Sequence, residues 1–431
     1  MASTAAPSLA RSLRRWDLVG VVLNGVIGAG IFGLPSKIFS LTGADSIFAF
    51  GACAVCVSTF VLCFAEVASR YSGTGGPYLY ARETYGPTVG FTVGWLVWIA
   101  RLTSFAANSN LLPAYLDLLF PGAGSGVPRV LILTGIVALL ALVNIRGVRL
   151  AADASNTLAI GKLLPLAVFI IAGLLFLDPA RFSFTMSPGY RPLTQSLLLL
   201  VYAFTGFEMA VIPAGEARKP ERDLPRALLM GMATVVAFYV LIQVVCIGTL
   251  PGLATSQRPL ADAANHFLGT WGAVMITIGI VIALAGNLNV LILAASRVLF
   301  AMAENGELPR RLQQVHPRFR IPVSGVLWTS AAMLALTLSG TFIYLVTISA
   351  ISRLVTYIVT CSALPVLRRR TTAPKAAFRM PAGVAVSLIG IVLALWLLSN
   401  ITLREARDTA LATAAGLCIY VFTRIFRSQR S

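Results

Sequence analysis

Two glycine-rich stretches inside apolar segments offer backbone groups that can bind a small molecule. The first stretch, 25–35, carries four glycines within nine residues, and the second, 202–215, carries Gly206, Pro213 and Gly215. Because glycine costs about 1 kcal/mol relative to alanine inside a helix, both stretches predict a helix break. Free amide and carbonyl groups at such a break are tolerated in a membrane only where they line a cavity or bind a ligand.

A pair of such breaks suits a zwitterion. The N-terminal end of a half-helix offers free N–H groups and a positive dipole end to a carboxylate, and exposed carbonyls accept hydrogen bonds from an ammonium group. Interrupted spans in corresponding positions of two inverted halves mark the binding sites of secondary transporters. The two stretches therefore predict an amino acid site. The alternative is that their glycines only allow helices to pack closely.

Ionisable side chains inside apolar segments form a second group of candidates. Lys162 lies in the segment 156–177, where a lysine costs about 2.5–3.5 kcal/mol on insertion scales and is a functional candidate by default. It is either a group that releases a proton or a permanently charged strut. Glu208 follows the second break, where it either relays protons or forms an ion pair with a cation such as Arg101 or Arg353.

Asn287 and Asn289 are amides near the predicted site, and hydrogen bonding between helices is the simpler interpretation of both.

The sequence gives little support to an enzyme or a metal site. The two histidines, His266 and His316, lie in loops, so no metal or cofactor is expected. An integral membrane enzyme is disfavoured because the chain contains neither an H-E-x-x-H nor a G-x-S-x-G motif.

The elements that must position these groups are membrane-spanning helices. The 431 residues are 57% hydrophobic and 12% charged, whereas soluble domains are about 25% charged. This composition excludes a soluble enzyme, a disordered chain and a coiled coil. Short interfacial helices are expected within 75–86 and 262–267. About 20 apolar residues make one span, and twelve segments qualify: 17–41, 45–69, 87–119, 128–145, 156–177, 193–216, 226–250, 270–301, 323–339, 341–367, 383–401 and 407–426.

The lysine and arginine residues behind the net charge of +18 lie mostly in the loops between apolar segments and do not form one basic face. With twelve spans, 23 lysine and arginine residues lie in the even-numbered loops and at the two termini, and six lie in the opposite loops. The positive-inside rule therefore places both termini in the cytoplasm. No nucleic acid partner is expected. The loops leave no room for a soluble domain, so the function must lie in the helix bundle.

Several motifs together resemble the amino acid–polyamine–organocation (APC) superfamily of secondary transporters, in particular bacterial amino acid permeases. The resemblance covers nearly the whole chain. It rests on the stretches Gly28–Phe32, Tyr202–Glu208 with Gly215–Glu216 and Pro220–Arg226, Thr74–Tyr78, Ser296–Ala303 and Gly306–Pro309.

This resemblance implies an all-α integral membrane fold of the leucine-transporter type. In that fold, two inverted repeats of five helices are followed by two further helices. The implied divisions are a cytoplasmic N-terminus (1–16), repeat one (17–178), repeat two (192–368) and the last two helices (383–426).

The resemblance also implies roles for particular residues. Amides near Gly28, Ala29 and Gly30 would bind the substrate carboxylate. Lys162 would place its ammonium group where sodium binds in sodium-coupled relatives. The substrate amine would bind to the carbonyls of Val26, Ile27, Phe204 and Thr205. The aromatic walls of the site would be Tyr202 and Phe207. The third span would add the pocket residues Arg101, Phe105 and Asn108. Arg101 departs from the small or neutral residue expected at its position.

The function implied is secondary active transport of amino acids across the plasma membrane by alternating access. Transport would be driven by protons or by exchange, without sodium. Polyamine exchange and amino acid export remain alternatives, although the predicted carboxylate site favours amino acids because polyamines have no carboxylate. The expected partners are the substrate and the lipid bilayer, and the protein is expected to be a monomer or a homodimer.

Overall fold

The computed structural model describes residues 9, 11–116, 122–146, 148–185, 189–339 and 342–428. Residues 1–8 and 10 of the predicted N-terminal segment lie outside this part. The described residues form helices and loops and contain no strand; one isolated bridge pairs extended backbone at Leu13 with Ala217. The all-α prediction is confirmed for the described chain.

Fourteen α-helices make up the described part. They are α1 (Arg15–Val26), α2 (Ala29–Thr42), α3 (Ser46–Ala68), α4 (Pro77–Tyr85), α5 (Pro87–Leu116), α6 (Gly126–Ile145), α7 (Val148–Leu174), α8 (Tyr190–Phe204), α9 (Pro220–Thr249), α10 (Pro259–Glu304), α11 (Val323–Ser339), α12 (Phe342–Arg369), α13 (Gly383–Leu398) and α14 (Leu403–Ser428).

Seven helical stretches of the described chain are long and apolar enough to cross a membrane, or eight if the bent pair α13 and α14 is one span. The chain is therefore a helical, multi-pass membrane protein, and the number twelve stays a prediction. Fewer than twelve helices meet this criterion for physical reasons. The first and sixth predicted spans are interrupted, which leaves α1 with 12 residues and α8 with 15. Helix α11, with 17 residues, is also short.

Both predicted helix breaks are confirmed. Helix α1 ends at Val26 and α2 begins at Ala29, with non-helical dihedral angles at Ile27 and Gly28 between them. Helix α8 ends at Phe204, and the chain continues through Gly206, whose φ of 118° is in the left-handed region that glycine adopts readily. Two short 3₁₀ turns, η3 (Phe207–Met209) and η4 (Ala214–Glu216), follow this break.

The two predicted short helices are also present. Helix α4 occupies most of the polar stretch 75–86. Helix α10 is interrupted at Gly269, whose φ of 67° and ψ of −163° are not helical, so its first part is a separate short helix over the predicted 262–267.

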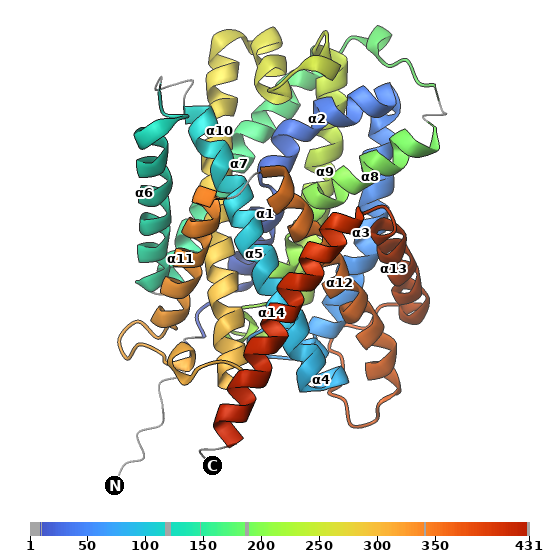
Figure 1. The fold of residues 1–431 in the computed structure, drawn as a ribbon. Coiled ribbons are helices and arrows are strands. Elements are labelled where there is room, and N and C mark those ends of the chain that lie inside the picture. The colour runs from blue at the N-terminus through green and yellow to red at the C-terminus, as the bar shows by residue number, and fades with distance from the viewer. Residues whose placement is uncertain are drawn as a thin grey trace.

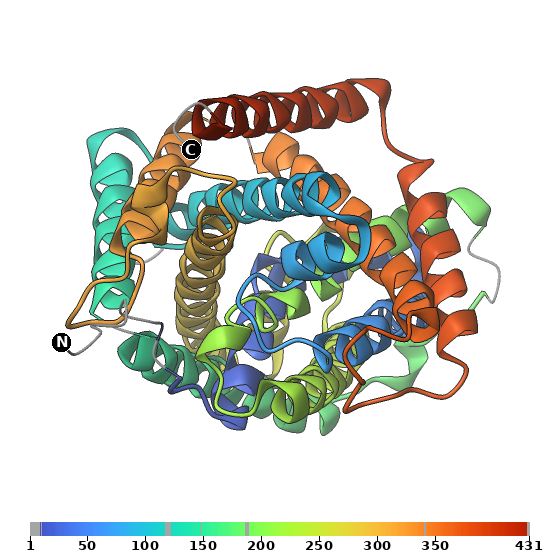
Figure 2. The ribbon, with the colours of Figure 1, turned by 90° about the horizontal axis from the view of Figure 1, so that it is seen from below.

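The helices around the first break form the centre of the bundle. Helix α1 packs against α7, α9 and α10, and α10 also packs along α5 and α7. Figure 1 shows α10 running along most of the length of the bundle, with α1 and α5 beside it. The view from below in Figure 2 places α14 along the outer edge, where it contacts α5 and α12. The centre is therefore walled by helices from distant parts of the sequence.

Candidate functional site

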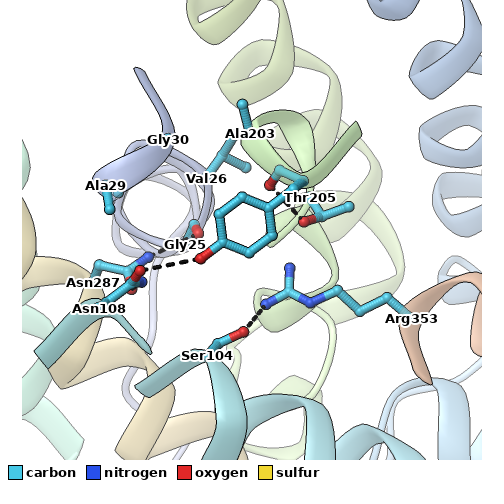
Figure 3. Close-up of a pocket in the computed structure, with 12 residues that line it drawn as sticks. Gly25, Val26, Ala29, Gly30, Ser104, Asn108, Ala203, Thr205, Asn287 and Arg353 are labelled. Atoms are coloured by element: carbon cyan, nitrogen blue, oxygen red, sulfur yellow. Dashed lines mark hydrogen bonds between the residues drawn. The ribbon is translucent and has the colours of Figure 1, made fainter. Parts of the chain in front are cut away.

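A narrow cavity of about 20 Å³ lies where the two helix breaks meet. It has room for about one water molecule, so its walls must move apart before an amino acid can bind. Figure 3 shows its walls, with Ala29 and Gly30 on one side and Arg353 on the other. The lining residues are Gly25, Val26, Gly28, Ala29, Gly30, Ser104, Asn108, Tyr202, Ala203, Thr205, Asn287 and Arg353.

The first break turns two helix ends toward this cavity. Ala29 and Gly30 are the first two residues of α2, where backbone N–H groups have no intrahelical acceptor. Val26 is the last residue of α1, where the dipole has its negative end. The first break therefore offers amides to an anion, whereas the Val26 carbonyl already accepts hydrogen bonds from the Gly28 amide at 2.8 Å and the Tyr239 hydroxyl at 3.1 Å.

The two breaks touch each other through glycine backbones. A Cβ atom added to Gly25 would lie 2.5 Å from the carbonyl oxygen of Gly206, and one added to Gly206 would overlap the carbonyl of Gly25. Both positions therefore require glycine for close approach, and Gly206 requires it for its positive φ as well. This contact couples the α1–α2 break to the end of α8.

A chain of hydrogen bonds crosses the cavity from α8 to α1. The hydroxyl of Tyr202 donates to Oδ1 of Asn108 at 3.1 Å, and Nδ2 of Asn108 donates to Oδ1 of Asn287 at 2.7 Å. Nδ2 of Asn287 donates to the carbonyls of Asn24 and Gly25, both at 2.9 Å. Asn287 thus holds the C-terminal end of α1 in place, in addition to joining two helices.

Lys162 is fully buried on α7 behind the first break. Its Nζ donates to the carbonyls of Leu23 at 3.1 Å and Ile27 at 2.8 Å. These carbonyls belong to the C-terminal end of α1, where the helix dipole stabilises a cation. The ammonium group is therefore bound by backbone oxygens of the same break whose other groups line the cavity.

Glu208 is the centre of a buried ionic cluster beside the cavity. Its Oε1 lies 2.9 Å from Nη2 of Arg101 and 3.5 Å from Nη1 of Arg353. Its Oε2 accepts hydrogen bonds from the hydroxyl of Tyr357 at 2.7 Å and from the amide of Gly206 at 2.9 Å. Of the two alternatives for Glu208, the ion pair with arginine is present, and it involves both arginines.

The structure brings most of the sequence-predicted residues together. Val26, Gly28, Ala29, Gly30, Tyr202, Thr205 and Asn287 line the cavity. Ile27 gives its carbonyl to Lys162 instead, and Arg101 lies behind the wall against Glu208.

The three predicted phenylalanines do not line the cavity. Phe105 is a fully buried core residue. Phe204 packs on the rings of Phe50 and Tyr239, and Phe207 packs on those of Phe64 and Tyr357. The lining residues that sequence reasoning did not place there are Gly25, Ser104, Ala203 and Arg353.

Access to the cavity differs between the two ends of the bundle. At the end where α1 begins, Nε of Arg297 lies 2.7 Å from Oε1 of Glu216, and both side chains are fully buried. The backbone of Leu13 exchanges hydrogen bonds with Glu216 and Arg218 at the same end. A larger apolar cavity of about 490 Å³ lies toward the other end and shares Ala29, Gly30 and Tyr202 with the central one.

Gly30→Val is expected to abolish ligand binding at the central cavity. A Cβ at Gly30 would already lie 3.0 Å from the Cα and Cβ of Ala203, so a valine would push into the space between the breaks. Uptake and binding should fall to background. Gly33→Val on the same helix is the matched control, because a Cβ there meets nothing within 4 Å. Retained binding in Gly30→Val would show that the site lies elsewhere.

Comparison with known proteins agrees with this geometry. The family model described as amino acid permease matches residues 13–422. A serine/threonine exchanger of Bacillus subtilis is 28% identical, with 92% of each chain covered. A methylthioribose transporter of the same species is 27% identical over 97% of this chain and 94% of its own. An arginine/agmatine antiporter of Chlamydia pneumoniae is 24% identical over 97% and 91%. The chain belongs to the amino acid permease family and is a membrane transporter, not an enzyme.

Proposed function

We propose that the protein is a secondary active transporter that moves amino acids across the plasma membrane by alternating access. The observation that carries this proposal is the meeting of two broken helices at one small polar cavity. The names of two relatives, a serine/threonine exchanger and an arginine/agmatine antiporter, support an amino acid as substrate.

The substrate's main-chain groups would bind at the first break. Amides at Ala29 and Gly30 would donate to its carboxylate, and the carbonyl of Thr205 would accept from its ammonium group. All three residues line the cavity. The Val26 carbonyl, which the sequence also suggested, already accepts hydrogen bonds from the Gly28 amide and the Tyr239 hydroxyl. Tyr202 would separate the bound substrate from the larger cavity, because it lines both spaces and is held by Asn108.

The packing of helices supports a fold with two inverted repeats, 17–178 and 192–368, plus the helices of 383–426. In such a fold, α1–α2 corresponds to α8, α3 to α9, α5 to α10 and α7 to α12. The contact of α1 with α9 then matches that of α3 with α8, and the contact of α5 with α12 matches that of α7 with α10. The short helix α4 matches the first part of α10.

Lys162 supports transport without sodium. Sodium ions in proteins are bound by oxygen atoms, and the lysine ammonium already occupies the carbonyls of Leu23 and Ile27. A fixed positive charge at this place would also repel a second cation. The energy source would then be a proton gradient or the exchange of one amino acid for another.

Alternating access would require the two ends of the bundle to open in turn. The buried pair Glu216–Arg297 closes the end where α1 begins, while the larger cavity reaches toward the opposite end. This arrangement fits an outward-directed state if both termini are cytoplasmic, as the distribution of lysine and arginine predicts. Opening of the N-terminal end would have to separate Glu216 from Arg297.

Flux in proteoliposomes tests the proposal and separates the two coupling modes. Purified protein is reconstituted, and uptake of a labelled amino acid mixture is measured with internal amino acids, with a pH gradient or with a sodium gradient. Stimulation by internal amino acid or by the pH gradient, with none by sodium, is the expected result. Uptake that needs sodium would contradict the role of Lys162. Uptake of putrescine or methylthioribose without any amino acid would overturn the substrate class.

A further inference from the structure

The wall of the cavity opposite the first break is built from buried arginine. Arg353 of α12 is 5% exposed and lines the cavity, and Arg101 of α5 is 1% exposed directly behind it. Figure 3 shows Arg353 reaching from α12 toward Ser104, whose Oγ accepts a hydrogen bond from Nη2 of Arg353 at 2.9 Å. The arginines come from helices more than 200 residues apart in sequence and meet at Glu208.

The two arginines carry more charge than their surroundings neutralise. Within the described chain, Glu208 is the carboxylate in ion-pair contact with either of them. Their other neighbours, Ser104 and Tyr357, are uncharged. Two guanidinium groups beside one carboxylate leave an excess of one positive charge in a buried site. Lys162 differs in that backbone carbonyls accept hydrogen bonds from its ammonium group, although these neutral groups do not cancel its charge.

Donors in this cluster are also left unused. Among the described residues, Nε of Arg353 and both Nε and Nη1 of Arg101 are buried without a hydrogen-bond partner. Leaving charged donors unpaired in a buried site is costly, and a guanidinium group binds a carboxylate through two parallel hydrogen bonds. Arg353 is a residue of the cavity wall, and its unpartnered Nε is enclosed by protein, so a ligand would reach the guanidinium group when the walls of the cavity move apart.

We infer that Arg353 forms a second carboxylate subsite and that the transported substrate is an acidic amino acid, aspartate or glutamate. This inference rests on the proposed function. The α-carboxylate and the ammonium group would bind at the first break, which leaves the side chain directed across the cavity toward Arg353. A side-chain carboxylate there would neutralise the excess charge. A cationic side chain would meet two arginines, so arginine and agmatine are disfavoured as substrates of this chain.

The test compares acids with their amides of nearly equal shape. Binding of aspartate, asparagine, glutamate and glutamine to the purified protein is measured by thermal stabilisation and by inhibition of uptake, in buffers containing chloride or gluconate. At least one acid should bind about tenfold or more tightly than its amide, since a charge-assisted bidentate contact is lost in the amide. The preference should be the same in both buffers.

Variants assign the preference to Arg353. In Arg353→Gln, the acid should lose its advantage while the amide binds as in the wild type, which also shows that the variant is folded. Arg353→Lys keeps the charge without the planar guanidinium group and should retain part of the preference. Lys375→Gln, at an exposed position in the loop between α12 and α13, removes the same charge and should leave the preference unchanged.

Three outcomes overturn the inference. Tighter binding of amides or other neutral amino acids than of acids would do so while leaving the proposed function intact. A chloride requirement for neutral substrates, with no competition by acids, would show that an inorganic ion neutralises the arginines. Binding of no amino acid at all would overturn the proposed function together with this subsite.

Discussion

Lys162→Ala is expected to reduce amino acid transport by about tenfold or more, which corresponds to about 1.4 kcal/mol in the transport barrier. The ammonium group of Lys162 bonds the carbonyls of Leu23 and Ile27 and so fixes the end of α1. Without it, these carbonyls lose their donors and the first break loses its defined geometry. Uptake into proteoliposomes at several pH values, with and without sodium, measures the effect.

The matched control is Lys375→Ala, which removes an exposed lysine from the loop between α12 and α13. This variant should transport at the wild-type rate. The melting temperature of Lys162→Ala in detergent should remain high enough for purification, because small molecules such as water can replace the lost donor at the carbonyls. Wild-type flux with an unchanged pH dependence in Lys162→Ala would rule out the coupling role of this lysine.

Glu208→Gln is expected to lower the free energy of unfolding by about 3–5 kcal/mol, as is typical when one partner of a buried ion pair is removed. The carboxylate of Glu208 is 1% exposed and neutralises one of the two arginine charges, Arg101 or Arg353. Glutamine leaves both charges buried. Thermal unfolding in detergent measures the loss, and transport should fall with it.

A second substitution tests whether charge is the cause. Glu208→Gln combined with Arg101→Gln has the same net charge in the cluster as the wild type, so it should be more stable than Glu208→Gln alone. The control Glu221→Gln replaces an exposed glutamate on α9 and should have little effect. Equal stability of Glu208→Gln and the wild type would show that the negative charge of Glu208 does not stabilise the fold.

The sequence predicted the two breaks because their cause is local. Glycine at Gly28 and Gly206 lowers helix stability at its own position, and the structure has non-helical backbone at both. The resemblance to the permease family, rather than this local effect, indicated Ala29 and Gly30, and both line the cavity. The burial of Lys162 followed equally directly, since its position inside an apolar segment leaves few places for it.

The side-chain directions could not be predicted in the same way. Phe204, expected to offer its backbone carbonyl, does not line the cavity. Phe105 and Phe207 lie near the site in sequence, but the rotation of their segments turns their rings into the core. That rotation is set by packing against helices from distant parts of the chain. Arg353 shows the reverse: the sequence suggested it only as an ion-pair partner of Glu208, and the fold shows that it also reaches the cavity.

The central claim is that the cavity between the two breaks binds an amino acid. A thermal-stability screen of the purified protein against the twenty amino acids and common polyamines tests this claim most directly, because a ligand that binds the folded state raises its apparent stability. One class of amino acids should stabilise the wild type and Gly33→Val but not Gly30→Val. Stabilisation by polyamines alone, or equal stabilisation of Gly30→Val, would contradict it.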